Sequence, residues 1–262
     1  MIIIMSFIVS KNQNDKPVLS KFNTQDIHFS DVKFIGKTNP RKVVNITYGS
    51  YEDKLTLQSP KMKIPYEIKG QTFDGITKYD INISFNDDDP KHRAFKETIK
   101  QIDNHMKEVV CNNDELSRKW LKQKSPSMEV AQALYNPMLK VHKNKDTGEP
   151  SGLWPDSLRI KLPFYKKYNE EEGKFGFDLF DCDTKEKVDN DSILENLKKG
   201  SSCRLLIENT GVYFVNGKYG LSWKVVQGSV SKPKQTYQSY SFVEDEDEDS
   251  RDEDVQSLDS DE

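Results

Sequence analysis

The chain has 262 residues, of which 34% are hydrophobic and 31% are charged, and its formal net charge is −4. A chain of this length can build a hydrophobic core unaided, which excludes a small scaffold that depends on disulfides or a structural metal. Its three cysteines lie far apart, with no CxxC pair and no Cys/His cluster, so no zinc site is indicated. The composition predicts a soluble, intracellular protein.

The chain opens with an apolar run from Met1 to Val9. This run lacks the basic leader and the small-residue cleavage site of a signal peptide. Nothing else in the chain approaches the roughly 20 apolar residues that cross a bilayer. We therefore expect no membrane partner, and interpret the run as a strand at the edge of a sheet or as the result of a true start at Met5.

From Arg41 to Phe85, apolar residues alternate in several short runs that are separated by Gly, Pro and Asp. A period of two predicts β-strands, and the short separations favour an antiparallel meander. The sequence assigns no function to the first 130 residues.

A helix is predicted to begin after Asp89, an N-cap residue that is followed by proline at the first helical position. Apolar residues then recur at spacings of three and four from Phe95 to Val109, which places them on one face of an amphipathic helix. A second short helix is predicted from Asp114 to Lys124. Because strands precede and follow them, we interpret residues 90–124 as a helical insertion.

Strand patterns return after Pro137 and carry more charge. In residues 157–162, Leu and Ile occupy one face while Arg159 and Lys161 occupy the other, so one face is predicted to be core and the other positive. Turns at Glu208–Gly211 and at Asn216-Gly217, the second typical of a type I′ hairpin, predict a meander of three strands. The candidate strands are 138–143, 157–162, 175–180, 203–208, 212–215 and 221–227, with a short helix near 191–198.

Many short strands without an alternating β-α-β pattern predict a mainly β fold, as a many-stranded barrel or sandwich with inserted helices. We expect residues 1–227 to form a single elaborated domain. Residues 228–243 are interpreted as a linker to residues 244–262, which form an acidic tail.

The tail holds 12 of the 43 carboxylates of the chain against one arginine, so the remaining body has 38 Lys and Arg against 31 Asp and Glu, about +7. A segment of like charges with two apolar residues cannot bury enough surface to offset its ordering entropy, so we predict disorder. A flexible polyanion beside a basic body is suited to gate a nucleic-acid site, and a purely solubilising tail is the alternative. The regulatory residues assigned here are Glu244, Asp245, Glu246, Asp247, Glu248, Asp249, Asp252, Glu253 and Asp254.

The motifs of common enzymes are missing from the sequence. There is no GxSxG, no HExxH and no kinase signature. Gly211 to Lys218 is only superficially similar to a phosphate-binding loop, because it has five residues between its glycines and Tyr219 in place of the Ser or Thr. We therefore predict no catalytic residue, no cofactor and no bound metal.

One acidic pattern keeps a metal-dependent nuclease as a less favoured alternative. The carboxylates of Asp178, Asp181 and Asp183, with Asp189 and Asp191 nearby, suit Mg²⁺ or Ca²⁺. The turn glycine of a calcium loop and its glutamate at the twelfth position are missing, which favours a solvated turn.

The second half of the chain interleaves basic and aromatic residues. Single-stranded nucleic acid is held by a positive groove that follows the backbone and by flat side chains on which bases stack. Core packing is the competing interpretation for Phe214 and Trp223, which share strand faces with apolar residues, whereas Trp154 lies in a loop between two basic strands. The residues assigned to nucleic-acid binding are Lys140, Lys143, Lys145, Trp154, Arg159, Lys161, Tyr165, Lys166, Lys167, Tyr213, Lys218 and Lys224.

Three segments, Tyr135–Lys140, Trp154–Pro163 and Lys218–Gln227, carry a resemblance to a known family. They resemble the single-stranded DNA-binding proteins of large nucleocytoplasmic DNA viruses, which are related to the acidic-tailed single-stranded DNA-binding proteins of short-tailed phages. The resemblance covers about Ala131 to Gln227 and the tail. It implies an OB-fold-like antiparallel barrel with extra strands.

The resemblance further implies a protein without enzymatic activity that coats exposed DNA strands during viral replication and recombination, in the host cytoplasm or nucleus. The tail would compete with DNA for the groove and recruit a polymerase or helicase. Phage tails of this kind end in an aromatic residue, whereas this chain ends in Asp-Ser-Asp-Glu with Phe242 at the root of the tail. A homodimer and RNA binding are left open. The main alternative is an interaction or chaperone protein whose acidic tail binds basic partners. The strand positions implied to contact the DNA backbone are Lys140, Arg159, Lys161 and Lys224.

Overall fold

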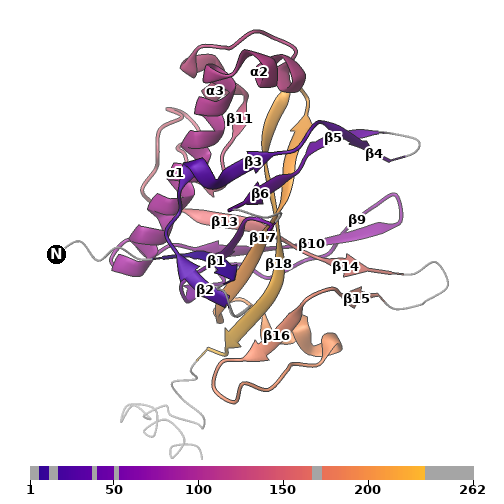
Figure 1. The fold of residues 1–262 in the computed structure, drawn as a ribbon. Coiled ribbons are helices and arrows are strands. Elements are labelled where there is room, and N and C mark those ends of the chain that lie inside the picture. The colour runs from indigo at the N-terminus through magenta and orange to yellow at the C-terminus, as the bar shows by residue number, and fades with distance from the viewer. Residues whose placement is uncertain (1–5, 12–16, 37–39, 50–52, 167–172, 234–262) are drawn as a thin grey trace, which may run out of the picture. The chain divides into compact units, whose positions relative to one another are not determined.

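The computed structural model describes residues 6–11, 17–36, 40–49, 53–166 and 173–233 (Figure 1). The described residues up to Lys232 form one compact unit, which is mainly β. The predicted acidic tail, most of the predicted linker and Lys167 lie outside the described residues. Among the described residues, no helix is both long and apolar enough to span a membrane.

The elements follow one another in three groups: strands, then helices, then strands with one short helix. The strands of the first half are β1 (Ile8–Lys11), β2 (Pro17–Ser20), β3 (Ile27–Phe29), β4 (Lys33–Ile35), β5 (Arg41–Val44), β6 (Ile46–Tyr48), β7 (Thr56–Gln58), β8 (Met62–Lys63), β9 (Gln71–Phe73) and β10 (Ile76–Ser84). The helices that follow are α1 (Pro90–Asn112), α2 (Asp114–Leu121) and α3 (Met128–Leu134). The second half contains β11 (Tyr135–Asn136), β12 (Leu139–Lys140), β13 (Ser157–Leu162), β14 (Phe164–Tyr165), β15 (Lys174–Phe175), β16 (Asp178–Asp181), α4 (Ile193–Asn196), β17 (Ser202–Val215) and β18 (Lys218–Ser231).

A long antiparallel hairpin of β17 and β18, with 14 residues in each strand, forms the centre of the sheet. Asn216 and Gly217 join the strands with φ values of 51° and 74°, which confirms the predicted type I′ turn. The predicted turn at Glu208–Gly211 is wrong, because the register shift between Asn209 and Gly211 makes this segment a bulge within β17. Two strands therefore replace the predicted three, and β18 runs to Ser231, beyond the predicted start of the linker.

The meander predicted for residues 41–85 is wrong in its pairing. β5, β7 and β8 each pair with β17, because one strand of 14 residues offers room for several short partners along its length. Two further pairings, of β13 with β10 and of β13 with β18, complete a closed circuit, β18–β13–β10–β8–β17–β18. β11, β13 and β16 all run parallel to β18, although the sequence predicted an antiparallel sheet.

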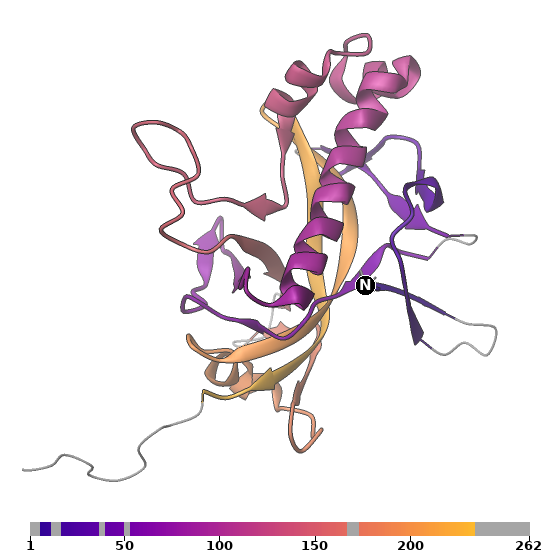
Figure 2. The ribbon, with the colours of Figure 1, turned by 90° about the vertical axis from the view of Figure 1, so that its left-hand side faces the viewer.

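Helices α1, α2 and α3 lie together beside the long hairpin, with α1 running along it (Figures 1 and 2). The predicted N-cap is confirmed, since Asp89 accepts a hydrogen bond from the Lys91 amide and Pro90 opens α1. The buried stripe of α1 ends at Val110 rather than at Val109, and α3 was not predicted. The apolar residues of that stripe are Phe95, Ile99, Ile102, Met106 and Val110.

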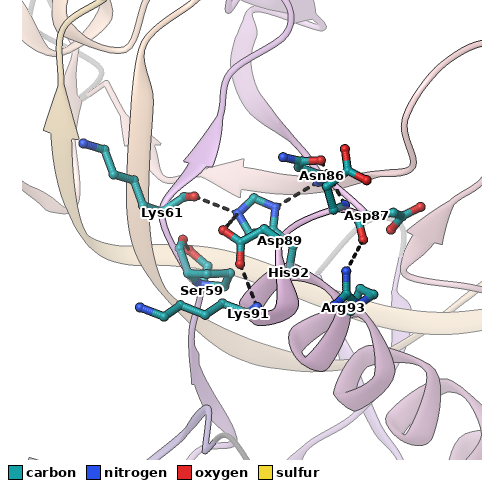
Figure 3. A network of polar contacts seen from close by, with 10 residues as sticks. Ser59, Lys61, Asn86, Asp87, Asp89, Lys91, His92 and Arg93 are labelled. Carbon is teal, nitrogen blue, oxygen red and sulfur yellow. Dashed lines mark hydrogen bonds and ion pairs between the residues drawn. The ribbon is translucent and has the colours of Figure 1, made fainter. Parts of the chain in front are cut away.

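A polar network ties the start of α1 to the sheet (Figure 3). The buried His92 ring accepts a hydrogen bond at Nδ1 from the Asn86 amide and lies 2.9 Å through Nε2 from the Lys61 carbonyl oxygen. Since a carbonyl can only accept, the proton of the neutral ring is on Nε2. On the same helical turn Lys96 forms ion pairs with Asp87 and Asp156. The start of α1 is therefore fixed against the segments that precede β8 and β13.

A second buried network, around Asp103 in α1, anchors the segment between β11 and β12. The Tyr135 hydroxyl donates to Asp103 Oδ1 at 2.6 Å, and the Met138 amide donates to Oδ2 at 3.0 Å. Burial is the largest influence on the pKa of Asp103 and raises it, although these hydrogen bonds act in the opposite direction. The carboxyl holds the Tyr135–Met138 segment against the helix.

We expect Asp103→Ala to lower the free energy of unfolding by about 3 kcal/mol, because it leaves a buried hydroxyl and a buried amide without an acceptor. Asp103→Asn keeps an oxygen acceptor and should cost less. Since the folded state holds the Asp103 proton to higher pH than the unfolded chain, this group lowers stability as pH rises between its unfolded and folded pKa values. Urea unfolding of the two variants and the unaltered protein at several pH values measures both the cost of each substitution and the pH dependence of stability. A cost that is equal for the two variants would contradict this account.

Candidate nucleic-acid interface

A groove of about 560 Å³ lies where β5, β10, β13, β17 and β18 come together. Among the described residues that line it, five side chains are basic and one is acidic, so this lining is strongly positive. Its charged residues are Arg41, Lys42, Lys140, Arg159, Lys161 and Asp80. Its aromatic residues are Tyr213, Phe214 and Trp223.

The groove exists because β13 and β18 diverge. These parallel strands pair only at Lys161 and Lys224. Where they separate, β11 pairs with β18 and β12 pairs with β13, so the intervening Pro137 and Met138 bridge the opening. The Asp103 contact with the Met138 amide fixes this bridge in place.

The alternation predicted for β13 is confirmed. Leu158, Ile160 and Leu162 are buried, and Arg159 and Lys161 are on the other face. Arg159 forms an ion pair of 2.8 Å with Asp80 on β10. The positive face of β13 is therefore part of the groove.

Lys161 makes a hydrogen bond across to β18. Its Nζ donates to the Ser222 hydroxyl at 2.7 Å. Burial is the largest cause that lowers the pKa of Lys161, Asp80 raises it, and the neighbouring charges of Lys78 and Arg41 lower it further. An anion here would meet the neighbouring cations Lys161, Lys78 and Arg41 and the one carboxylate of Asp80. This excess of positive charge favours binding of a phosphate backbone.

Lys42 has a structural contact within the groove. Its Nζ donates to the backbone carbonyls of Lys119 and Trp120 at the end of α2, at 2.9 Å for Trp120, and lies 4.7 Å from the centre of the Phe214 ring. A cation at the C-terminus of a helix satisfies carbonyls that lack partners. Lys42 therefore joins β5 to the helices.

Trp223 forms part of the groove wall and is only 5% exposed, with buried Leu221 and Val225 on the same strand face as predicted. Its Nε1 and the Nδ2 of Asn209 are buried donors without a hydrogen-bond partner among the described residues. The two residues are directly paired across β17 and β18. The indole is thus a packed wall of the groove rather than an open stacking surface.

Tyr213 is held in place by a glycine. A Cβ built at Gly220 would lie 2.8 Å from the Tyr213 hydroxyl oxygen and 2.9 Å from the Asn136 carbonyl oxygen. The phenol ring therefore lies over Gly220, its cross-strand partner. This contact explains why glycine is needed within the Lys218–Gln227 segment.

Lys224 is on the polar face of the sheet but outside the groove lining. Its Nζ lies 3.1 Å from Glu208, and Lys54 forms a second ion pair with the same carboxylate at 2.9 Å. Burial raises the pKa of Glu208, and the two lysines together outweigh it and hold the pKa below its usual value. The carboxylate is therefore ionised and partly neutralises Lys224.

The remaining predicted binding residues are dispersed around the groove. Lys143, Lys145 and the exposed Trp154 belong to the β12–β13 loop, which projects away from the sheet (Figure 2). Lys218 follows the tip of the long hairpin, and Tyr165 and Lys166 lie in or beside β14. Of the twelve predicted residues, the groove brings together Lys140, Arg159, Lys161 and Tyr213.

The chain is similar to solved phage proteins. A single-stranded DNA-binding protein from bacteriophage Enc34 in complex with ssDNA is 13% identical, with a TM-score of 0.43, and the match covers 78% of this chain and 97% of the phage chain. The single-stranded DNA-binding protein gp2.5 of bacteriophage T7 is 11% identical, with a TM-score of 0.42, over 72% of this chain and 98% of the phage chain. No protein-family description and no curated protein matches the chain. The resemblance to proteins of large nucleocytoplasmic DNA viruses stays a prediction.

The predicted metal pattern is dispersed in the structure. Asp178 forms an ion pair with Lys187, and Asp181 accepts hydrogen bonds from the amides of Asp183 and Thr184, which lower its pKa. Within the described ranges, no three His, Cys, Asp or Glu side chains are placed to hold a metal ion together. This arrangement favours the interpretation of the segment as a turn.

Sequence reasoning missed the part of the groove that comes from the first half of the chain. Arg41, Lys42 and Asp80 line it, and Lys78 acts on Lys161 from the same side. The one available signal was the placement of Arg41 and Lys42 immediately before the apolar Val43 and Val44 at the start of a predicted strand.

Proposed function

We propose that this protein binds single-stranded DNA in the groove between β5, β13 and β18, without enzymatic activity and without strong sequence preference. The observation that carries the proposal is the positive lining, in which Arg159, Lys161 and Arg41 share one groove with Tyr213. Cations placed beside a flat side chain suit a chain of phosphates with unpaired bases. The closed strand circuit supports an OB-fold-like barrel as the platform.

The proposed biological setting is coating of exposed strands during viral DNA replication and recombination, at the intracellular sites where the viral genome is copied. In this proposal, residues 244–262 compete with DNA for the groove and recruit replication proteins such as a polymerase or helicase. The support is the charge of about −11 on this segment against the positive groove.

Binding of the full-length protein and of residues 1–243 to a fluorescent single-stranded oligonucleotide and to its duplex, each at two salt concentrations, tests the proposal. We expect preference for the single strand, weaker binding at the higher salt concentration, and tighter binding by the truncated protein. Removal of a competing polyanion of about −11 should tighten binding by about tenfold at low salt and by less at high salt, because salt screens the competition.

The possible failures have different meanings. Equal or weaker binding by residues 1–243 would contradict the competition by the tail while leaving the groove in place. No binding by either protein would overturn the proposed function and favour an acidic-tailed interaction protein for basic partners. Cleavage of the oligonucleotide in the presence of Mg²⁺ would instead favour a nuclease.

A further inference from the structure

The β9–β10 hairpin carries two exposed apolar side chains that no part of the groove accounts for. Phe73 and Ile76 are directly paired across the hairpin and are 73% and 61% exposed. Asp74 and Gly75 form the turn between them, with φ values of 49° and 73° that are typical of a tight type I′ turn. The hairpin projects beyond the sheet on the side opposite the helices (Figure 1). An aromatic ring is thus held in solvent at the end of a regular hairpin.

The exposed pair is on the groove side of this hairpin. Side chains alternate along a strand, so Ile76, Lys78 and Asp80 share one face of β10. Asp80 lines the groove and pairs directly with Lys161 on β13. Four residues of strand, about 13 Å, separate Ile76 from Asp80, with Lys78 midway between them.

The opposite face of the hairpin is packed, which leaves the groove face open. The Tyr79 ring lies 4.9 Å from the Phe164 ring and 5.2 Å from the Phe175 ring, measured between ring centres. The hydroxyls of Thr72 and Thr77 are hydrogen-bonded across the strands at 3.0 Å. These contacts support the hairpin from behind and fix the direction in which Phe73 and Ile76 point.

We propose that the β9–β10 hairpin extends the DNA site, with a base that leaves the groove stacking on Phe73 beside Ile76 and with Lys78 meeting the phosphate backbone between them. This inference rests on the proposed function. Single-stranded DNA is the occupant because the apolar pair continues a face whose cations, Lys78, Arg41 and Lys161, lie close together. Stacking on an aromatic side chain contributes about 1 to 3 kcal/mol per base.

An exposed apolar residue outside the groove supplies a control. Leu19 is 47% exposed in β2, which is the last strand on the path β17–β7–β1–β2. The described residues that line the groove include none from β1, β2 or β7. Leu19 is therefore an exposed apolar side chain that lies off the proposed path of the DNA.

The test compares Phe73→Ala, Phe73→Trp and Leu19→Ala with the unaltered protein on oligothymidines of about 4 and about 20 nucleotides, which bracket the usual site sizes of OB folds. We expect Phe73→Ala to weaken binding of the long oligonucleotide by about tenfold and to leave binding of the short one unchanged. Phe73→Trp should retain the affinity for the long oligonucleotide, and Leu19→Ala should change the affinity for neither oligonucleotide.

Three results would overturn the inference. Unchanged binding of the long oligonucleotide by Phe73→Ala would show that the ring is not part of the site, and an equal loss on both lengths would show an indirect effect on the groove. A loss of self-association in Phe73→Ala, seen by sedimentation without any change in DNA affinity, would assign the pair to an interface between copies of this chain. Failure of the unaltered protein to bind either oligonucleotide would overturn the proposed function itself.

Discussion

Reversal of the two charges on the groove face of β13, by Arg159→Glu together with Lys161→Glu, is expected to weaken binding of single-stranded DNA by about 100-fold, which corresponds to about 2.7 kcal/mol. Both side chains line the groove, and Lys161 is additionally hydrogen-bonded to Ser222 and lies near the charges of Lys78 and Arg41. The variant removes two cations and places two carboxylates where phosphates are proposed to lie. The measurement is a fluorescence-anisotropy titration.

The salt dependence separates direct phosphate contact from indirect effects. Each lost contact to a single strand should reduce the slope of log K against log salt by about 0.7. Neutral replacements, Arg159→Gln with Lys161→Gln, should therefore reduce the slope by about 1.4 with a smaller loss of affinity. A reduced affinity with an unchanged slope would contradict direct contact and would indicate a disturbed groove.

Two further variants make this experiment specific. Lys143→Glu with Lys145→Glu makes the same change in charge on the β12–β13 loop, outside the groove lining, and should weaken binding by less than about tenfold. Asp80→Asn removes the acidic side chain of the groove that pairs with Arg159 and should strengthen binding. An equal loss from the loop variant and from the β13 variant would mean that binding depends on net charge rather than on the groove.

The second large effect concerns stability. Trp223→Ala is expected to lower the free energy of unfolding by about 3 to 5 kcal/mol, because the indole is 5% exposed and its removal leaves a cavity beneath the groove. For a unit of this size the melting temperature should fall by on the order of 10 °C. Calorimetry of residues 1–243 with and without Trp223→Ala measures this fall in melting temperature.

Trp223→Phe is the informative companion. Within the part of the chain that the structure describes, the buried indole Nε1 has no hydrogen-bond partner, so a ring that lacks this donor loses no hydrogen bond there. We expect Trp223→Phe to cost much less than Trp223→Ala, since only part of the ring volume is lost. A cost for Trp223→Phe close to that of Trp223→Ala would show that the N–H does have an acceptor, such as a buried water.

Features set by neighbouring residues could be predicted from the sequence. The alternation that points Arg159 and Lys161 away from the core follows from the period of a strand alone. Asp89 before Pro90 starts a helix, and Asn216 with Gly217 forms a tight hairpin turn, because each depends on the conformational preferences of two adjacent residues.

Features that depend on a distant partner could not be predicted in this way. The Glu208–Gly211 segment has the residues of a turn, but Asn209 accepts a hydrogen bond from the Gly211 amide within a strand, and pairing with β5 and β18 keeps that strand continuous. A local pattern of Asn, Thr and Gly fits a bulge as well as a turn, so only the partner strands decide between them.

The sequence by itself determined that the protein is mainly β, that its body is basic and its tail acidic, and that β13 has one charged face. Only the tertiary structure decided that Arg41 and Asp80 join Lys161 in one groove, and that Phe73 faces the same way. The reason is physical: period and charge are properties of neighbouring residues, whereas a groove forms where strands distant in the chain pair and then diverge, and their register is set by packing of the whole sheet.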